Sequence, residues 1–131
     1  MFNAYNYLAI VDRIIDGDTI VVTVDTGFYL KYKTQVRLLR VNAPETRGAS
    51  REKGLETKEF LSKTIPVGST IYIHTEKDDA FGRWLAEVFY LNKDGKAKNL
   101  GSELLEKGLA CLYTKYKTQE ENNENSFIEF S

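Results

Sequence analysis

Four short stretches of this chain hold charged and polar residues at positions that a folded domain would more readily fill with other types. They read IDGDT at 15–19, VRLLRVNAPET at 36–46, DDAFGR at 78–83 and LYTKY at 112–116. Carboxylate oxygens suit hard cations such as Ca²⁺, and guanidinium groups bind phosphate through paired N–H donors. Carboxylates and arginines together offer what cleavage of a phosphodiester requires, which is positive charge on the nonbridging oxygens and a group that activates water.

The first stretch lies inside a run of β-branched residues, IIDGDTIVV at 14–22. An Asp-Gly pair between two apolar runs is a strong hairpin signal, because both residue types tolerate the positive φ of a tight turn. That interpretation accounts for Asp16 and Gly17. It does not account for Asp18, since aspartate is disfavoured at the start of a strand, where its side chain competes for backbone hydrogen bonds.

Hydrophobic periodicity and turn residues predict the elements that position these stretches. Ser50 and Asn99 are the expected helix N-caps, and Gly108 fits the left-handed end of the second helix. The predicted elements are three strands at about 6–15, 18–25 and 28–42, a helix at 51–65, strands at 69–76 and 84–91, and a helix from 100 to 108.

This order of elements predicts an α+β, mainly β fold, in which a five-stranded sheet curls into an OB-type barrel with two to three helices. Residues 1–116 are expected to form this single domain. Residues 117–131 are polar, acidic and low in complexity, so we expect a flexible tail there.

Composition narrows the class of protein. The net charge is −1 and the isoelectric point about 5.9, so any nucleic-acid contact must be local rather than spread over a basic surface. The single cysteine, Cys111, cannot form an internal disulfide, and we expect it to be a small buried residue in a reducing compartment. With no signal-like or membrane-spanning apolar stretch, we expect a soluble cytoplasmic monomer without a membrane partner.

Taken together, the four stretches resemble the thermonuclease (staphylococcal nuclease) family of OB-fold phosphodiesterases. The resemblance covers about residues 8–116 in the same order, and RLLRVNAPET is its most specific part. It implies a Ca²⁺-dependent nuclease that hydrolyses DNA or RNA with little sequence preference and leaves 3′-phosphate ends.

The resemblance also implies a role for individual residues. Asp18 matches the family's calcium-binding aspartate, and Glu45 matches the glutamate proposed as general base for water. Arg37 and Arg83 match the two arginines that bind phosphate and stabilise the charge of the leaving group. The tyrosines that stack on or bond to the nucleotide correspond to Tyr113 and Tyr116.

Three positions depart from the family's pattern. The second calcium-binding aspartate falls on Asn42. The following residue, often a threonine in the type member, is Ala43, whose backbone carbonyl is the expected ligand. Asn42 keeps an oxygen ligand but loses a charge, which weakens a Ca²⁺ site. Ala80 replaces a lysine that approaches the nucleotide phosphate in the type member, so the resemblance does not predict the affinity for substrate.

Each of these residues also has an ordinary structural interpretation. Asp16 can cap the turn, Arg37 and Arg83 can be solvated surface arginines, and the two tyrosines can be packing residues. His74 is expected to be a partly exposed residue without a catalytic role.

The alternative functions are a non-catalytic OB module that binds nucleic acid or a protein partner, and an interaction protein that docks through its acidic tail. Retention of Asp18, Arg37, Glu45 and Arg83 together favours the enzyme. For the enzyme, we expect removal of either arginine to lower activity and to change stability little.

Overall fold

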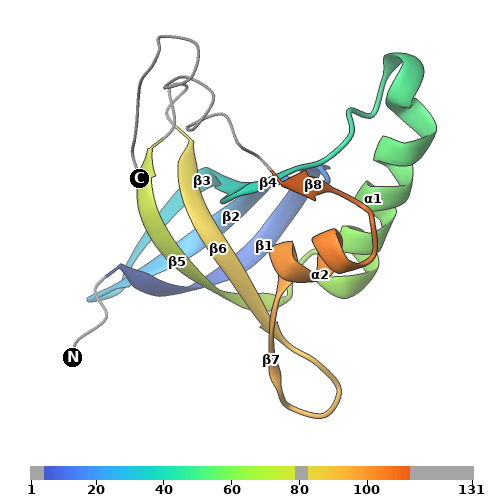
Figure 1. Ribbon diagram of the computed structural model, residues 1–131. Helices are drawn as coiled ribbons and strands as arrows, with labels where there is room; N and C mark the ends of the chain where they lie inside the picture. Colours follow the sequence, from blue (N-terminus) through green and yellow to red (C-terminus); the bar gives the residue numbers. More distant parts are fainter. Residues whose placement is uncertain (1–4, 79–82, 113–131) are drawn as a thin grey trace, which may run out of the picture.

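The computed structural model describes residues 5–78 and 83–112, and its main element is a closed β-barrel (Figure 1). Strands β1 (Asn6–Asp16), β2 (Thr19–Gly27) and β3 (Leu30–Leu38) form an antiparallel meander, and β5 (Thr70–Asp78) and β6 (Trp84–Leu91) form a hairpin-like pair. The strand order is β3-β2-β1-β5-β6, and a parallel pairing of β3 with β6 closes the barrel. The expected α+β, OB-type fold is confirmed.

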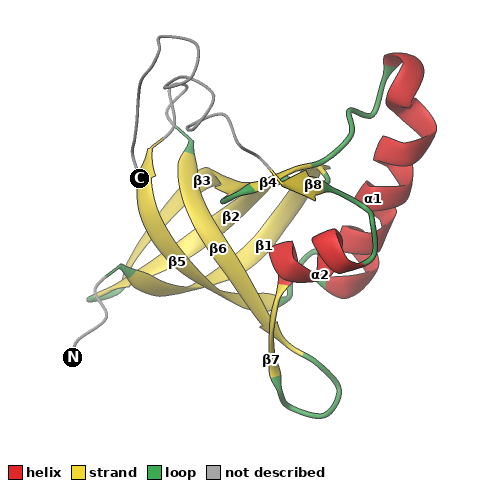
Figure 2. Ribbon diagram, in the orientation of Figure 1, coloured by secondary structure: helices red, strands yellow, loops and turns green. Residues whose placement is uncertain are grey.

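Two helices cover one side of this barrel (Figure 2). A 3-10 turn, η1 (Gly48–Ser50), leads into α1 (Arg51–Thr64), and α2 (Leu100–Glu106) follows the short strand β7 (Ala97–Asn99). The two-residue strands β4 (Val41–Asn42) and β8 (Cys111–Leu112) pair with each other. Patterning placed the residues of β4 at the end of one long strand, 28–42, and did not predict β7 or β8, because two or three residues are too few to show a period.

Branched aliphatic side chains fill the barrel, because residues of this shape pack well on the pleated surface of a sheet. Fully buried residues come from every long strand, and Leu61 of α1 and Leu104 of α2 extend the core at the helical side. The largest members from the strands are Val11, Ile20, Val22, Val24, Val36, Leu38, Ile71 and Ile73. None of the described helices has the length and apolar character that a bilayer crossing requires.

The second helix begins as the sequence predicts. The side chain of Asn99 accepts a hydrogen bond from the backbone N–H of Ser102 at 3.1 Å, and Gly108 has a φ of +71° just after the helix. Tyr90 of β6 donates a hydrogen bond to Glu103 of α2, which ties the helix to the barrel. Burial, together with the Glu103 carboxylate, raises the pKa of Tyr90 to about 12.

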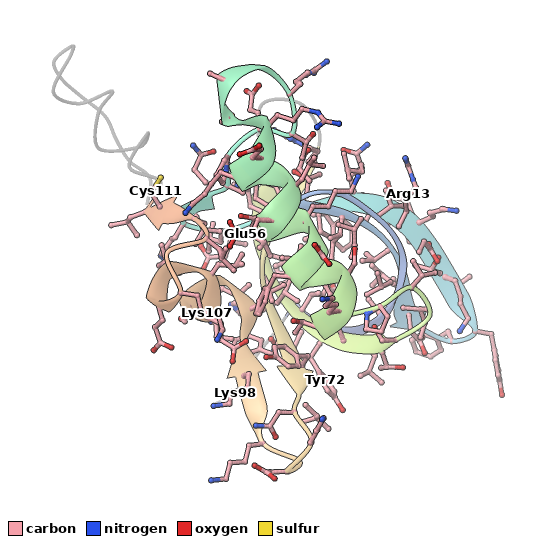
Figure 3. The ribbon with its side chains drawn as sticks, turned by 90° about the vertical axis from the view of Figure 1, so that its right-hand side faces the viewer. Arg13, Glu56, Tyr72, Lys98, Lys107 and Cys111 are labelled. Carbon is pink, nitrogen blue, oxygen red and sulfur yellow. The ribbon has the colours of Figure 1, made fainter. Side chains whose placement is uncertain are left out.

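Two local predictions are wrong. The Ser50 side chain does not cap α1 but donates to the backbone carbonyl of Glu45 at 3.1 Å. Cys111 is exposed rather than buried, because β8 is a short surface ladder whose side chains do not reach the barrel interior (Figure 3).

Helix α1 approaches the loop after β4 so closely that only glycine fits at position 54. A Cβ added to Gly54 would lie 2.2 Å from the carbonyl oxygen of Glu45 and 2.8 Å from that of Pro44. The clash is with backbone atoms, which cannot rotate away, so helix and loop are held at one distance.

We expect Gly54→Ala to lower the free energy of unfolding by about 1–3 kcal/mol, because the helix or the loop must shift to admit the methyl group. Urea unfolding measures this change. Gly101→Ala in α2 is the matched control, since its Cβ would meet neighbours only at 3.4 Å or more. Equal stability of the two variants would contradict the close packing of α1 on the loop.

Candidate active site

Asp18 lies in the two-residue turn between β1 and β2, and is buried with 8% of its surface exposed. Its carboxylate accepts hydrogen bonds from the Thr19 hydroxyl at 3.0 Å and from the Ala43 N–H at 2.8 Å. Its backbone carbonyl accepts the N–H of Leu38 at 2.9 Å. Asp18 is thus a turn residue bonded to β3 and to Ala43, directly after β4, and the predicted start of β2 at residue 18 moves to Thr19.

Arg37 is buried next to Asp18, and it is not the solvated surface arginine of the ordinary interpretation. Its Nη1 donates to the carbonyl of Leu38 at 2.9 Å and to that of Val41 at 2.8 Å. Its Nη2 donates to the Asn42 side-chain oxygen at 3.1 Å and lies 3.7 Å from a carboxylate oxygen of Asp18. One guanidinium therefore joins β3, β4 and the β1–β2 turn.

The charges of Asp18 and Arg37 compensate each other in this buried position. Their side chains are 12% and 10% exposed, so both have lost most of their hydration. Removing one partner of such a pair leaves the other charge buried and uncompensated, which is far more costly than losing a surface ion pair.

The loop after β4 carries Glu45, whose side chain is exposed. Two hydrogen bonds fix this loop: the Thr46 hydroxyl donates to Asp16 at 3.2 Å, and the Ser50 hydroxyl donates to the Glu45 carbonyl at 3.1 Å. Asp16 therefore holds a loop 30 residues away, in place of the turn-capping role expected for it.

Gly17 is needed for space and not for its backbone conformation. It is absent from the described glycines with positive φ, and a Cβ there would lie 2.4 Å from Thr57 of α1 and 2.9 Å from Ala43. Thr57 is fully buried and donates its hydroxyl to the Leu109 carbonyl at 2.7 Å. The turn that carries Asp18 thus packs tightly between Ala43, directly after β4, and α1.

Arg83 immediately precedes β6 and is half-buried. The next residues fix its place, because Trp84 is the register partner of Val36 and Leu85 that of Arg37. Leu85 is the residue of β6 opposite Arg37, and Arg83 lies two residues before it, about 7 Å along the strand. The backbone thereby brings the two predicted phosphate-binding arginines to neighbouring strands.

Three residues from the sequence analysis lie outside the described part of the chain: the predicted nucleotide-binding Tyr113 and Tyr116, and Ala80, which replaces the family's lysine. Their roles stay predictions. His74 lies on β5, and its Nδ1 is 2.7 Å from the Asn6 side-chain oxygen. This contact belongs to the β1–β5 pairing, and His74 is partly exposed, as expected.

The oxygen atoms near Asp18 fit a hard cation by type, but they supply little negative charge. The described residues contain no group of three His, Cys, Asp or Glu side chains arranged to hold a metal ion. Asp18 and Asn42 offer carboxylate and amide oxygens, and both are within reach of the same Arg37 nitrogen. Such a donor set suits weak binding of Ca²⁺, and a ligand role for the Ala43 carbonyl stays a prediction.

Comparison with known sequences identifies the family of the chain. The family model described as Staphylococcal nuclease homologue matches residues 35–130, which include Arg37, Asn42, Glu45 and Arg83. The chain belongs to this family. The match also runs through most of the segment 117–131, which we expected to lie beyond the domain.

Relatives of this staphylococcal nuclease family chain come from distant organisms. It is 29% identical over 92% of its length to the endonuclease YhcR of Bacillus subtilis, and 32% identical over 77% to the protein ParB of Escherichia coli. It is 27% identical over 82% to the uncharacterized protein MJ1439 of Methanocaldococcus jannaschii. The matched regions are 10%, 54% and 60% of these proteins, so the chain spans less than two thirds of each.

Sequence reasoning missed the residues that support the site from behind. Gly17, Gly54 and Thr57 make no predicted contact with substrate, yet they set the distance of α1 from the two site loops. A glycine in the middle of a helical pattern was the available signal for Gly54, since it weakens the helix unless a close approach requires it.

The burial of Arg37 changes the expectation for its removal. We expect Arg37→Ala to lower the free energy of unfolding by about 3 kcal/mol, because Asp18 would remain buried without its partner. Arg13→Ala, at an exposed arginine on β1 (Figure 3), is the control and should change stability by less than about 0.5 kcal/mol. Chemical denaturation compares them, and an Arg37→Ala protein as stable as the control would exclude the buried pair.

Proposed function

We propose that this chain is a phosphodiesterase of the nuclease type that hydrolyses DNA or RNA with little sequence preference. The observation that carries the proposal is the Asp18–Arg37–Asn42 group beside the Glu45 loop, in a chain of the staphylococcal nuclease family. The name of its Bacillus subtilis relative, an endonuclease, points the same way.

The two arginines hold the phosphate in this proposal. Arg37 comes from a buried position and Arg83 from the start of the neighbouring strand, and in this proposal the charges of both act on one phosphate. Positive charges fixed in place stabilise the charge that develops on the phosphate in the transition state, and they need little reorganisation during the reaction.

Glu45 accepts a proton from the attacking water in this proposal. Its exposed side chain sits on a loop that two hydrogen bonds and Gly54 hold in place, which suits a base that must meet solvent at a fixed position. The water oxygen forms a bond to phosphorus, the bond to the 5′ oxygen breaks, and that oxygen takes up a proton. The products carry a 3′ phosphate and a 5′ hydroxyl.

Ca²⁺ is the cofactor that the resemblance implies, and Asp18 with Asn42 would hold it. When bound, it supplies positive charge to a nonbridging phosphate oxygen. Asp18 contributes the only carboxylate among these two donors, so we propose that the phosphate of the substrate supplies the remaining negative charge and strengthens metal binding.

The test is incubation of the pure chain with single-stranded DNA, duplex DNA and RNA, each with Ca²⁺ or with a chelator. Cleavage that requires Ca²⁺ and yields 3′-phosphate ends supports the proposal in full. Cleavage that does not depend on Ca²⁺ would support the nuclease activity and contradict the proposed calcium requirement. An intact substrate in every arm would leave the alternative, a non-catalytic module that binds nucleic acid or protein.

We expect Glu45→Gln to lower the cleavage rate by at least about a hundredfold, because an amide cannot take the proton from water. Nucleotide affinity and stability should hardly change, since the side chain is exposed. Glu52→Gln, at an exposed glutamate in the first turn of α1, is the control and should cleave at the normal rate. A normal rate for Glu45→Gln would exclude its role as the base.

We expect Asn42→Asp to lower the Ca²⁺ concentration for half-maximal cleavage, because it adds a charge to the donor set at nearly constant volume. Arg37, which already bonds to this side chain, offsets the repulsion with Asp18. Asn42→Ala should raise the required concentration. Calorimetric titration with Ca²⁺, with and without a nucleoside bisphosphate, measures both effects, and identical Ca²⁺ affinities in all three proteins would place Asn42 away from the metal.

A further inference from the structure

A row of polar side chains runs along the outer face of β3, away from the candidate active site. Successive side chains of a strand point to opposite faces, and Val36 is fully buried in the core, so Arg37 lies on the outer face. Gln35, Lys33 and Lys31 lie on that same face, because β3 pairs with β2 without a register shift over this span. These three residues, the β3 row, end about 20 Å from Arg37 along the strand.

The members of the β3 row are groups that bind phosphate. All three are exposed, and they follow one another at intervals of about 7 Å. That interval is close to the spacing of successive phosphates along an extended nucleic-acid strand. Lysine offers its ammonium group and glutamine its amide N–H, and both are common partners of phosphate oxygens. The row therefore has one donor for each of three phosphates in succession.

Two carboxylates lie close to the lysines of the row. Asp25 of β2 is the register partner of Lys31, and Asp12 of β1 lies 3.9 Å from Lys33. Both carboxylates also accept hydrogen bonds from residues of β2, at 2.9 Å for Asp25 and 2.6 Å for Asp12. The Lys33 side chain is 70% exposed, so its contact with Asp12 is weak and leaves the ammonium group available to a phosphate.

The edge of the sheet gives a substrate access to the lysines from the side away from these carboxylates. β2 lies on one side of residues 30–35, and on the other side the described part of β6 pairs only with residues 36–38. The main contacts of α1 and α2 with long strands are to β1 and β6. The β3 row thus lies on an edge strand, and Asp12 and Asp25 lie on the strands behind it.

We propose that the β3 row binds successive phosphates of the substrate strand on one side of the cleaved bond, as an extension of the phosphate site at Arg37. This inference rests on the proposed function. The contacts reach phosphates and no base, so they raise the affinity for nucleic acid of any sequence and favour a chain of several nucleotides over a dinucleotide. β3 carries no carboxylate, and its row is the local basic surface that a chain of net charge −1 needs.

Binding at several salt concentrations tests the β3 row. In a chelator, labelled single-stranded DNA of two, four and ten nucleotides is titrated with protein, and the fluorescence anisotropy of the label gives the affinity. The DNA is checked for cleavage afterwards. The salt dependence counts the phosphates in contact, because each neutralised phosphate contributes about 0.7 to the slope of log K against log salt.

Lys31→Gln combined with Lys33→Gln removes two charges from the row. We expect this double variant to bind the ten-nucleotide strand at least about fivefold more weakly at low salt, and its salt slope to fall by about 1.4. The loss should shrink as salt is added and should grow with the length of the DNA. Gln35→Lys adds a cation within the row, so it should tighten binding of the long strand and raise the slope by about 0.7.

Lys93→Gln combined with Lys96→Gln is the matched control, because both lysines are exposed and the change of charge is the same. β3 and β6 run parallel, and these lysines follow β6 whereas the β3 row precedes Arg37. The control therefore removes its charges on the opposite side of the arginines, and its affinity should change less than about twofold.

The outcomes separate this inference from the proposed function. A double variant that equals the control in affinity and salt slope overturns the inference and leaves the nuclease intact. Self-association of the double variant in sedimentation, with unchanged DNA binding, also overturns it, because the lysines would then serve to keep the edge of β3 from pairing with another chain. If no substrate is cleaved but binding depends on the row as expected, the nuclease proposal fails and the row stands as a nucleic-acid contact.

Discussion

A guanidinium buried beside a carboxylate is the interaction on which the rest of the site depends. Neither Arg37 nor Asp18 retains much water, so the surrounding backbone must supply the missing hydrogen bonds. The carbonyls of Leu38 and Val41 serve the guanidinium, and the N–H of Ala43 serves the carboxylate. These bonds fix the path of the chain from β3 into β4, and with it the place of Asn42 and of the loop that follows.

Close packing supplies the second constraint. Gly17 and Gly54 let the β1–β2 turn and the Glu45 loop touch α1 at distances that any side chain would prevent. The helix therefore acts as a support behind both acidic positions, although it contributes no predicted ligand itself. Site geometry held by backbone contacts and buried side chains is the kind that catalysis by positioning requires.

Local signals in the sequence predicted the long strands, through alternation of residue types, and the two ends of α2, through Asn99 and Gly108. Each of these signals depends on residues only a few positions apart in the chain. Two of the wrong predictions concern contacts between distant segments, because Asp16 bonds to Thr46 and Cys111 pairs with Asn42 on the surface. The third, Ser50, bonds to the Glu45 carbonyl five residues before it instead of capping α1. Arg37, Asp18 and Asn42 were found through their motifs, but only the fold shows that a single nitrogen of Arg37 lies near the side-chain oxygens of both Asp18 and Asn42. The domain boundary at 116 and the two tyrosines stay predictions.

The ladder between β4 and β8 joins Asn42 to Cys111, two residues that are far apart in the chain. During synthesis on the ribosome, all five strands of the barrel emerge before β8, since β6 ends at Leu91. Domains form as their segments leave the ribosome, so the barrel can be in place while the partner strand of Asn42 is still missing. A ladder of two residue pairs also opens more easily than the long strand pairs. The barrel can therefore acquire its shape before β8 completes the surroundings of Asn42.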